Sequence, residues 1–148
     1  MSELINEITI DAPIEKIWAI LSNVEGLENC DPNVKKSECL TNSKTGLGAS
    51  RKVHMQDGKN WFDETITVFK QNEALTYELT ACSFPITKLK HSYSFQKTAN
   101  YVKVQQIMEY TVKFGLLGKL LNALMIGKQF DKGIKQFLDG LKSYAEKN

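Results

Sequence analysis

The C-terminal third of the chain carries a long amphipathic pattern that predicts a single helix from Leu117 to about Lys147. Apolar residues recur there at the three- and four-residue spacing of one buried helical face. This face comprises Leu117, Leu120, Leu121, Leu124, Ile134, Phe137, Leu138, Leu141 and Ala145. A face of this length needs an extended apolar partner, which the upstream residues have to supply as a sheet. Because a sheet wrapped around one helix often leaves a gap beside it, the pattern also indicates where a ligand could bind.

The first thirty residues predict one strand followed by two short helices. Residues 4–10 alternate between apolar and polar positions, which is typical of a strand with one buried face. Pro13 then lies in the first turn of a predicted helix, where its missing N–H costs little. The apolar face of that helix consists of Ile14, Ile17, Trp18 and Leu21. A second short helix is expected at about 24–29, ending before Pro32.

Six further segments alternate with a period of two and predict strands. They span about 34–41, 48–56, 60–70, 74–82, 87–97 and 101–114. Tight turn sequences such as Asp57-Gly58 separate them, and such short connections join antiparallel neighbours. The order of elements predicts an α+β fold in which a seven-stranded antiparallel sheet wraps around the C-terminal helix. Neither a linker nor a repeat interrupts this order, so residues 1–148 are expected to form one domain.

Alternation also assigns the side chains that face the helix, and a shift of one residue would reverse any assignment. The last strand is the clearest case, because its charged face must point to solvent. Its inward face is Val102, Val104, Gln106, Met108, Tyr110 and Val112. The other inward sets are Arg51, Val53 and Met55; Phe62, Glu64, Ile66 and Val68; Leu75, Tyr77, Leu79 and Ala81; and His91, Tyr93 and Phe95. The same alternation points Phe69 and His54 outward.

Three local features of the sequence match a known family. At residues 8–18 an apolar strand leads through Ala12-Pro13 into a helix carrying Ile17-Trp18, residues 46–51 contain a Gly-x-Gly turn into the third strand, and Glu64 follows. The opening, the turn and a frequent Glu at that place resemble the START and birch-pollen-allergen (SRPBCC) superfamily, whose fold is called the helix-grip fold. The resemblance covers the whole chain and is closest to the polyketide cyclase/dehydrase and lipid-transport branch. It implies a cavity for a small hydrophobic ligand between the sheet and the C-terminal helix.

The sequence departs from that branch at one place. Near the start of the second strand the branch often has Trp before Pro, whereas this chain has Asn29-Cys30-Asp31-Pro32. The departure concerns residues expected at the mouth of the cavity. The family includes carriers, receptors, cyclases and ring-hydroxylase subunits, so the resemblance predicts the fold more narrowly than the function.

Composition narrows the classes of function. The formal net charge is +2, and the 19 basic residues include a single arginine, Arg51. Nucleic-acid binders usually carry a basic stripe with several arginines, so we expect no nucleic-acid partner. Three cysteines without metal-ligand spacing favour a reduced, cytoplasmic environment. The acidic first residues lack a signal-peptide core, and no apolar stretch is long enough for stable membrane insertion.

Motifs for metal binding, cofactor binding or nucleophilic catalysis are weak. His54 and His91 are far apart and are predicted on opposite faces, so we expect neither a metal site nor a cofactor. The nucleophile motif Gly-x-Ser-x-Gly does not occur in the sequence. The glycine pair at 46 and 48 precedes a strand rather than a helix, so it offers no helix end for a phosphate.

Polar side chains on the otherwise apolar inner face are the remaining candidates. We expect Arg51 and Glu64 either to pair or to lie near the rim, because an unpaired buried charge is costly. In the functional interpretation a few such groups orient an apolar ligand. The candidate ligand-binding residues are Arg51, Phe62, Glu64, Tyr77, His91, Tyr93, Gln106, Met108, Tyr110, Leu124 and Phe130. A catalytic version would use Glu64 or His91 as general base, with Arg51 or a tyrosine stabilising an enolate in an aldol-type cyclisation.

Several glycines occur within the predicted C-terminal helix. Gly127 lies where the apolar face changes phase, so we expect a kink or break there. It would be either a local packing adjustment or a hinge that widens the cavity mouth. Residues 116–126 are apolar almost all round and could mark a ligand-loading surface, a homodimer contact or a transient membrane contact.

Three classes of function are compatible with the sequence. A module that binds or carries a small hydrophobic ligand, such as a lipid or polyketide, is favoured. The first alternative is a cyclase or dehydratase-like enzyme acting in the same cavity. The second is a protein-interaction module that uses the fold without a ligand, as a co-chaperone does.

Overall fold

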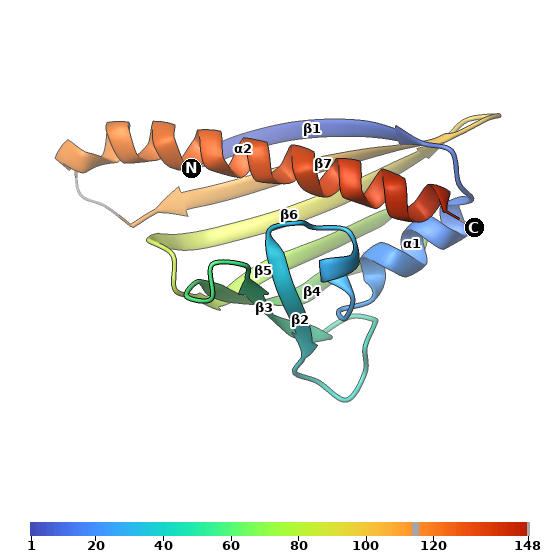
Figure 1. Ribbon diagram of the computed structural model, residues 1–148, viewed down its shortest axis with the longest axis horizontal. Helices are drawn as coiled ribbons and strands as arrows, with labels where there is room; N and C mark the ends of the chain where they lie inside the picture. The colour runs from blue at the N-terminus through green and yellow to red at the C-terminus, as the bar shows by residue number, and fades with distance from the viewer. Residues whose placement is uncertain (114–115, 148) are drawn as a thin grey trace.

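The structure is a computed structural model that describes residues 1–113 and 116–147, and the side chains at positions 116–123 lie outside the described part. The chain begins with strand β1 (Ser2–Ile10), helix α1 (Ile14–Ser22) and the 3₁₀ turn η1 (Leu27–Asn29). The strands that follow are β2 (Val34–Cys39), β3 (Ser50–Met55), β4 (Trp61–Lys70), β5 (Ala74–Cys82), β6 (Ile86–Lys97) and β7 (Val102–Val112). Helix α2 (Leu116–Glu146) completes the fold (Figure 1).

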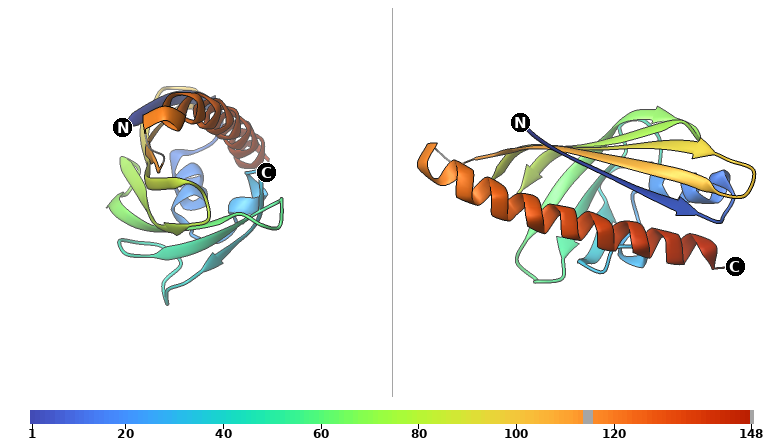
Figure 2. Two further views of the ribbon diagram at one scale, coloured as in Figure 1. Left: turned by 90° about the vertical axis from the view of Figure 1, so that its left-hand side faces the viewer. Right: turned by 90° about the horizontal axis from the view of Figure 1, so that it is seen from above.

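The seven strands form one antiparallel sheet in the order β1-β7-β6-β5-β4-β3-β2. Helix α2 lies next to β1, and the sheet curls from there around the space beside the helix to β2 and β3 (Figure 2). This arrangement is the helix-grip fold expected from the sequence.

The core lies where α1, the C-terminal part of α2 and the inner face of the sheet meet. Trp18 of α1 is buried, and its ring packs edge-on against Phe69 and Phe95, with ring centroids 5.1 and 5.7 Å away. The predicted face of α2 is buried at Ile134, Phe137, Leu138, Leu141 and Ala145. Burial of these apolar side chains is the main favourable contribution to the free energy of packing α2 against the sheet.

A helical turn occurs where the second helix was predicted, but it is not an α-helix. Residues 24–29 contain only the three-residue 3₁₀ turn η1 instead of an α-helix. Gly26 interrupts the segment with a φ of 87°, in the left-handed region, so no α-helical turn can run through it.

The inward face of the last strand is confirmed, since all six of its residues are buried. Three assignments on strands β4 and β5 are wrong. Ala81 is exposed, Phe69 points inward onto Trp18, and Val68 is paired with Thr76 on the opposite face. The β4–β5 ladder has register shifts at Asp63/Glu64 and at Ile66/Val68, and each shift reverses the alternation beyond it.

Helix α2 is continuous through Gly127, so the expected break is wrong. The glycine serves a close approach, because a Cβ atom there would lie 2.8 Å from the Tyr110 hydroxyl oxygen. Leu124 was predicted on the buried face but is 60% exposed. The first part of α2 projects beyond the end of the sheet (Figure 1). The predictions for Leu117, Leu120 and Leu121, and for most of the apolar segment 116–126, concern side chains outside the described part of the chain.

Candidate functional site

A cavity of about 320 Å³ lies between the inner face of the sheet and α2. Strands β3, β4, β6 and β7, the loop after η1 and the middle of α2 form its walls. Its apolar lining is Leu27, Met55, Phe62, Phe84, Ile86, Leu89, Met108, Phe130, Ile134 and Phe137. Its polar lining is Asp31, Asn33, Arg51, Glu64, His91, Tyr93, Gln106 and Gln129. An apolar cavity of this size with a few polar groups is typical of a site for a small molecule.

Arg51 and Glu64 form a buried ion pair in the wall of the cavity. The two residues are direct partners across the β3–β4 ladder, which brings their side chains to the same face. Arg51 donates from Nε and Nη2 to the same oxygen, Glu64 Oε1, at 2.7 and 2.6 Å. The guanidinium also lies 4.1 Å from the centre of the Tyr77 ring. Burial disfavours the charged guanidinium, but Coulombic interactions with Tyr77 and Glu64 and the hydrogen bond to Glu64 raise the pKa of Arg51 overall, so the guanidinium stays charged.

The second oxygen of this carboxylate, Glu64 Oε2, is buried and has no hydrogen-bond partner among the described residues. Leaving a buried acceptor unsatisfied costs about 1–3 kcal/mol, and more when the group is charged. The wall of the cavity therefore contains an acceptor that the described part of the protein does not use.

His91 and Gln106 form a second polar contact in the same wall. Gln106 Nε2 lies 3.0 Å from His91 Nδ1, and Gln106 Oε1 is buried without a partner among the described residues. Burial lowers the pKa of His91, and the positive charge of Arg51 also lowers it, although Glu64 opposes the shift. The imidazole is therefore neutral near pH 7 and can donate or accept a proton inside the cavity.

The two candidate tyrosines of β5 and β6 have different surroundings. The Tyr77 hydroxyl donates to the carbonyl oxygen of Leu21 at 2.8 Å, and burial raises the pKa of Tyr77 to about 12. Tyr93 lines the cavity and packs edge-on against Phe137. Burial raises the pKa of Tyr93 well above its ordinary value, so both hydroxyls keep their protons at neutral pH.

The structure brings together most of the residues that the sequence proposed for ligand binding. Those that line the cavity are Arg51, Phe62, Glu64, His91, Tyr93, Gln106, Met108 and Phe130. Tyr77 lies behind Arg51, Tyr110 packs edge-on against Phe130, and Leu124 is on the surface, so none of these three lines the cavity. Contact of the lining residues with a ligand stays a prediction.

Asp31, Asn33 and Gln129 are polar lining residues that the sequence did not single out. Burial raises the pKa of Asp31. Asn33 Nδ2 donates to Gln136 Oε1 at 2.8 Å, which ties the loop after η1 to α2. The departure of residues 29–32 from the family pattern was the available indication, because Asp31 belongs to that segment.

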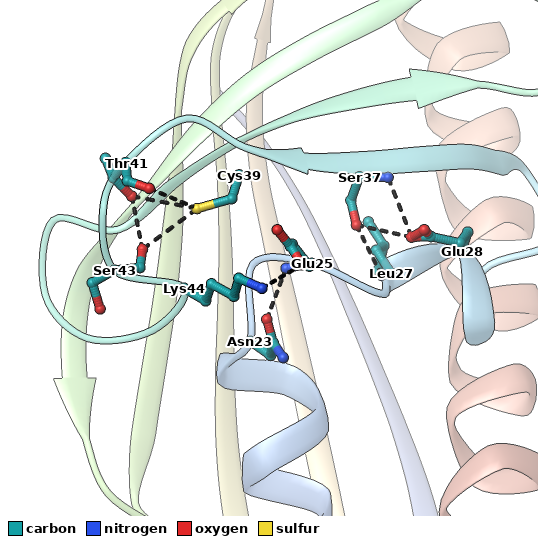
Figure 3. A network of polar contacts seen from close by, with 9 residues as sticks. All are labelled: Asn23, Glu25, Leu27, Glu28, Ser37, Cys39, Thr41, Ser43 and Lys44. Carbon is teal, nitrogen blue, oxygen red and sulfur yellow. Dashed lines mark hydrogen bonds and ion pairs between the residues drawn. The ribbon is translucent and has the colours of Figure 1, made fainter.

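A polar network next to this loop holds the wall of the cavity in place (Figure 3). The Ser37 hydroxyl of β2 accepts from the Leu27 backbone N–H at 3.0 Å and donates to Glu28 Oε1 at 3.1 Å. These bonds fix η1 against β2, and Leu27 in turn lines the cavity. The position of the wall thus depends on a serine that does not itself face the cavity.

The described residues contain no cluster of three or more ligating side chains that could hold a metal ion. His54 faces a hollow on the outer side of the sheet, lined by Lys35, Lys36 and Trp61, so the two histidines do not meet. Among the described helices, none combines the length and the apolar character needed to cross a bilayer.

We expect the free energy of unfolding to fall as the pH is lowered through about 6.5, the ordinary pKa of histidine. The pKa of His91 is lowered in the folded state, so the unfolded chain takes up a proton that the folded imidazole resists. Above this pH the residue is neutral in both states and contributes nothing.

Urea unfolding of the wild type and of His91→Gln between pH 8 and pH 5 measures this contribution. The wild type is expected to lose more stability over this range than the variant, which lacks the imidazole's resistance to protonation. Identical losses would show that His91 takes up a proton as readily in the folded state as in the unfolded one.

Structures of known proteins match this fold over nearly the whole chain. Solved structures with a similar fold include the Zhui aromatase/cyclase from Streptomyces sp. R1128, with a TM-score of 0.83 and 14% identity over 98% of this chain and 93% of that one. A START superfamily protein from Mycobacterium smegmatis gives a TM-score of 0.78 and 18% identity over 97% of each chain. A protein from Thermus thermophilus gives 0.81 and 18%, also over 97% of each chain. At these identities the likeness concerns the fold alone.

No curated protein matches the sequence. A family model described as polyketide cyclase/dehydrase and lipid transport matches residues 1–146. Because this match covers nearly the whole chain and agrees with the START-like fold, the protein belongs to the polyketide cyclase/dehydrase and lipid-transport family.

Proposed function

We propose that this protein binds or carries a small hydrophobic molecule in the cavity between the sheet and α2. The observation that carries the proposal is the cavity itself, about 320 Å³ in volume and lined mainly by aliphatic and aromatic side chains. An apolar ligand that enters the cavity removes apolar surface of both ligand and protein from water. Membership of a family described by both cyclisation and lipid transport supports the same site.

The polar lining fits a role in orienting the ligand. Arg51 and Glu64 neutralise each other through bonds of 2.6 and 2.7 Å, so Glu64 is engaged rather than free to abstract a proton. One observation favours the alternative of a cyclase or dehydratase. His91 is a neutral imidazole in the cavity wall, close enough to Glu64 for the carboxylate to raise its pKa. A general base has these properties, and it additionally needs contact with a substrate.

We expect N-phenyl-1-naphthylamine, a neutral apolar dye, to bind the wild type with a rise in fluorescence. Met108→Trp is expected to weaken this binding at least tenfold, because the indole fills part of the cavity that Met108 lines. Met125→Trp is the matched control, since Met125 is 59% exposed on α2 and the same substitution leaves the cavity unchanged. Fluorescence titration at constant protein concentration gives both affinities.

The proposal fails if the dye does not bind the wild type or binds both tryptophan variants equally. Native mass spectrometry of the protein purified from its own host identifies the natural occupant. A small molecule that co-purifies unchanged agrees with a carrier, and one released in chemically altered form favours the enzyme. A stable protein partner without any small molecule favours the interaction module.

A further inference from the structure

Resting on the proposed function, we propose that the ligand is a neutral molecule whose polar end is a hydrogen-bond-donating hydroxyl group, as in an alcohol or phenol. The proposal excludes ligands whose polar end is a carboxylate. It follows from the unused acceptors in the cavity wall, from the charge balance of the lining and from the grouping of these polar side chains.

Two buried oxygen atoms in the cavity wall could each accept a hydrogen bond from a ligand. Glu64 and Gln106 both line the cavity and are 2% and 1% exposed, and each has one oxygen without a hydrogen-bond partner among the described residues. A hydroxyl group of a ligand could donate to either oxygen and remove the penalty of leaving it unsatisfied. Ketone and ether oxygens only accept, so they cannot satisfy these atoms.

The charges of the lining oppose a carboxylate. The described lining contains one permanent cation, Arg51, against the two carboxyl groups of Glu64 and Asp31, and the half-buried His91 is neutral. The guanidinium already directs two of its N–H groups to one oxygen of Glu64. An acidic ligand would add a third carboxyl group to this buried set, and burying a charge without an opposite partner is strongly unfavourable.

The polar groups gather at one part of the wall, which gives the site a direction. Arg51 and Glu64 face each other across β3 and β4, while Gln106 reaches His91 from β7 to β6. Tyr77 is the cross-strand partner of His91, and its ring centre lies 4.1 Å from the Arg51 guanidinium, so the two pairs lie close together. The hydroxyl end of the ligand belongs at this cluster, and its apolar body belongs against the aromatic lining of Phe62, Phe84 and Phe130.

Three probes of the same ring system test the inference by displacement of N-phenyl-1-naphthylamine at pH 7. They are 2-naphthol, which donates a hydrogen bond, 2-methoxynaphthalene, which only accepts, and 2-naphthoate, which is anionic. We expect 2-naphthol to displace the dye at a concentration about tenfold lower than either of the others, since a hydrogen bond to a charged group contributes about that factor.

Two variants assign the preference to the proposed atoms. Gln106→Met removes one unused acceptor at similar side-chain length and is expected to weaken 2-naphthol several-fold while leaving 2-methoxynaphthalene unchanged. Glu64→Gln leaves Arg51 without its counter-charge and is expected to shift the preference toward 2-naphthoate. Tyr110→Phe is the control, because it removes a hydroxyl group from the same strand as Gln106 but outside the cavity.

The outcomes separate this inference from the function on which it rests. If the dye binds but 2-methoxynaphthalene or 2-naphthoate displaces it as well as 2-naphthol does, the hydroxyl assignment is wrong and the binding function stands. If Gln106→Met and Tyr110→Phe change the three affinities alike, the preference does not arise at this cluster and the inference is wrong. If the dye does not bind at all, both the proposed ligand-binding function and the inference about the hydroxyl group are wrong.

Discussion

Replacing Gly140 with alanine is expected to lower the free energy of unfolding by about 3 kcal/mol. Gly140 lies on the buried side of α2, where the helix crosses the loop after η1. A Cβ atom at this position would overlap the carbonyl oxygen of Cys30 and lie 2.8 Å from its carbonyl carbon. The obstacle is backbone rather than the end of a flexible side chain, so the helix and the loop have to move apart.

Two other glycines of the same helix provide matched controls. At Gly133 the nearest atom to an added Cβ is Asn33 Nδ2 at 4.0 Å, an ordinary contact, so Gly133→Ala is expected to stabilise the protein by up to about 1 kcal/mol through helix propensity. Gly127→Ala should fall between the two, because its obstacle is the hydroxyl end of Tyr110. Urea unfolding followed by circular dichroism measures all three. Equal effects at Gly140 and Gly133 would mean that α2 does not approach Cys30 so closely.

This close approach also bears on the cavity. Cys30 is buried and directly precedes Asp31, which lines the cavity, and burial raises the pKa of the Cys30 thiol to about 12. The loop is held to α2 at two points, the contact with Gly140 and the hydrogen bond from Asn33 to Gln136. The wall containing Asp31 is therefore set by the position of the helix, and a variant that displaces α2 should change ligand binding as well as stability.

The strand pattern was predictable because the buried face of each strand repeats with a period of two. Val102 to Val112 illustrates this, since every second residue is buried. The same rule failed at Phe69 and Ala81, where bulges in the β4–β5 ladder insert a residue that no alternation reveals. A bulge depends on how two strands pair, and the sequence of one strand does not contain that information.

The candidate site was predictable in its members rather than in their contacts. Arg51 and Glu64 were expected either to pair or to lie near the rim, and the choice depended on the register of β3 against β4. Asp31 was missed because the cavity acquires it from a loop, where neither period applies. The role of Gly127 was left open between a local packing adjustment and a hinge, since a close approach to Tyr110 and a helix break both favour glycine, and only the packing distinguishes them.

Breaking the Arg51–Glu64 pair is expected to cost about 3–5 kcal/mol from either side. Arg51→Met leaves a carboxylate that is 2% exposed without its cation, and Glu64→Leu leaves a guanidinium that is 5% exposed without its anion. The double variant Arg51→Met/Glu64→Leu removes both charges and is expected to regain most of the loss, because buried ion pairs are often replaceable by apolar side chains of similar size. Urea unfolding of the four proteins completes the double-mutant cycle.

The cycle also separates the stability of the pair from its function. If the pair is retained to orient a ligand, the folded double variant should still bind N-phenyl-1-naphthylamine but show a smaller preference for 2-naphthol over 2-methoxynaphthalene, since Gln106 Oε1 is then the remaining unused acceptor. Single variants that each cost less than about 1 kcal/mol would contradict the burial of the pair, since a solvated ion pair contributes no more than that. A double variant as unstable as the single ones would instead show that the charges are integral to the fold, because apolar packing would then have failed to replace them.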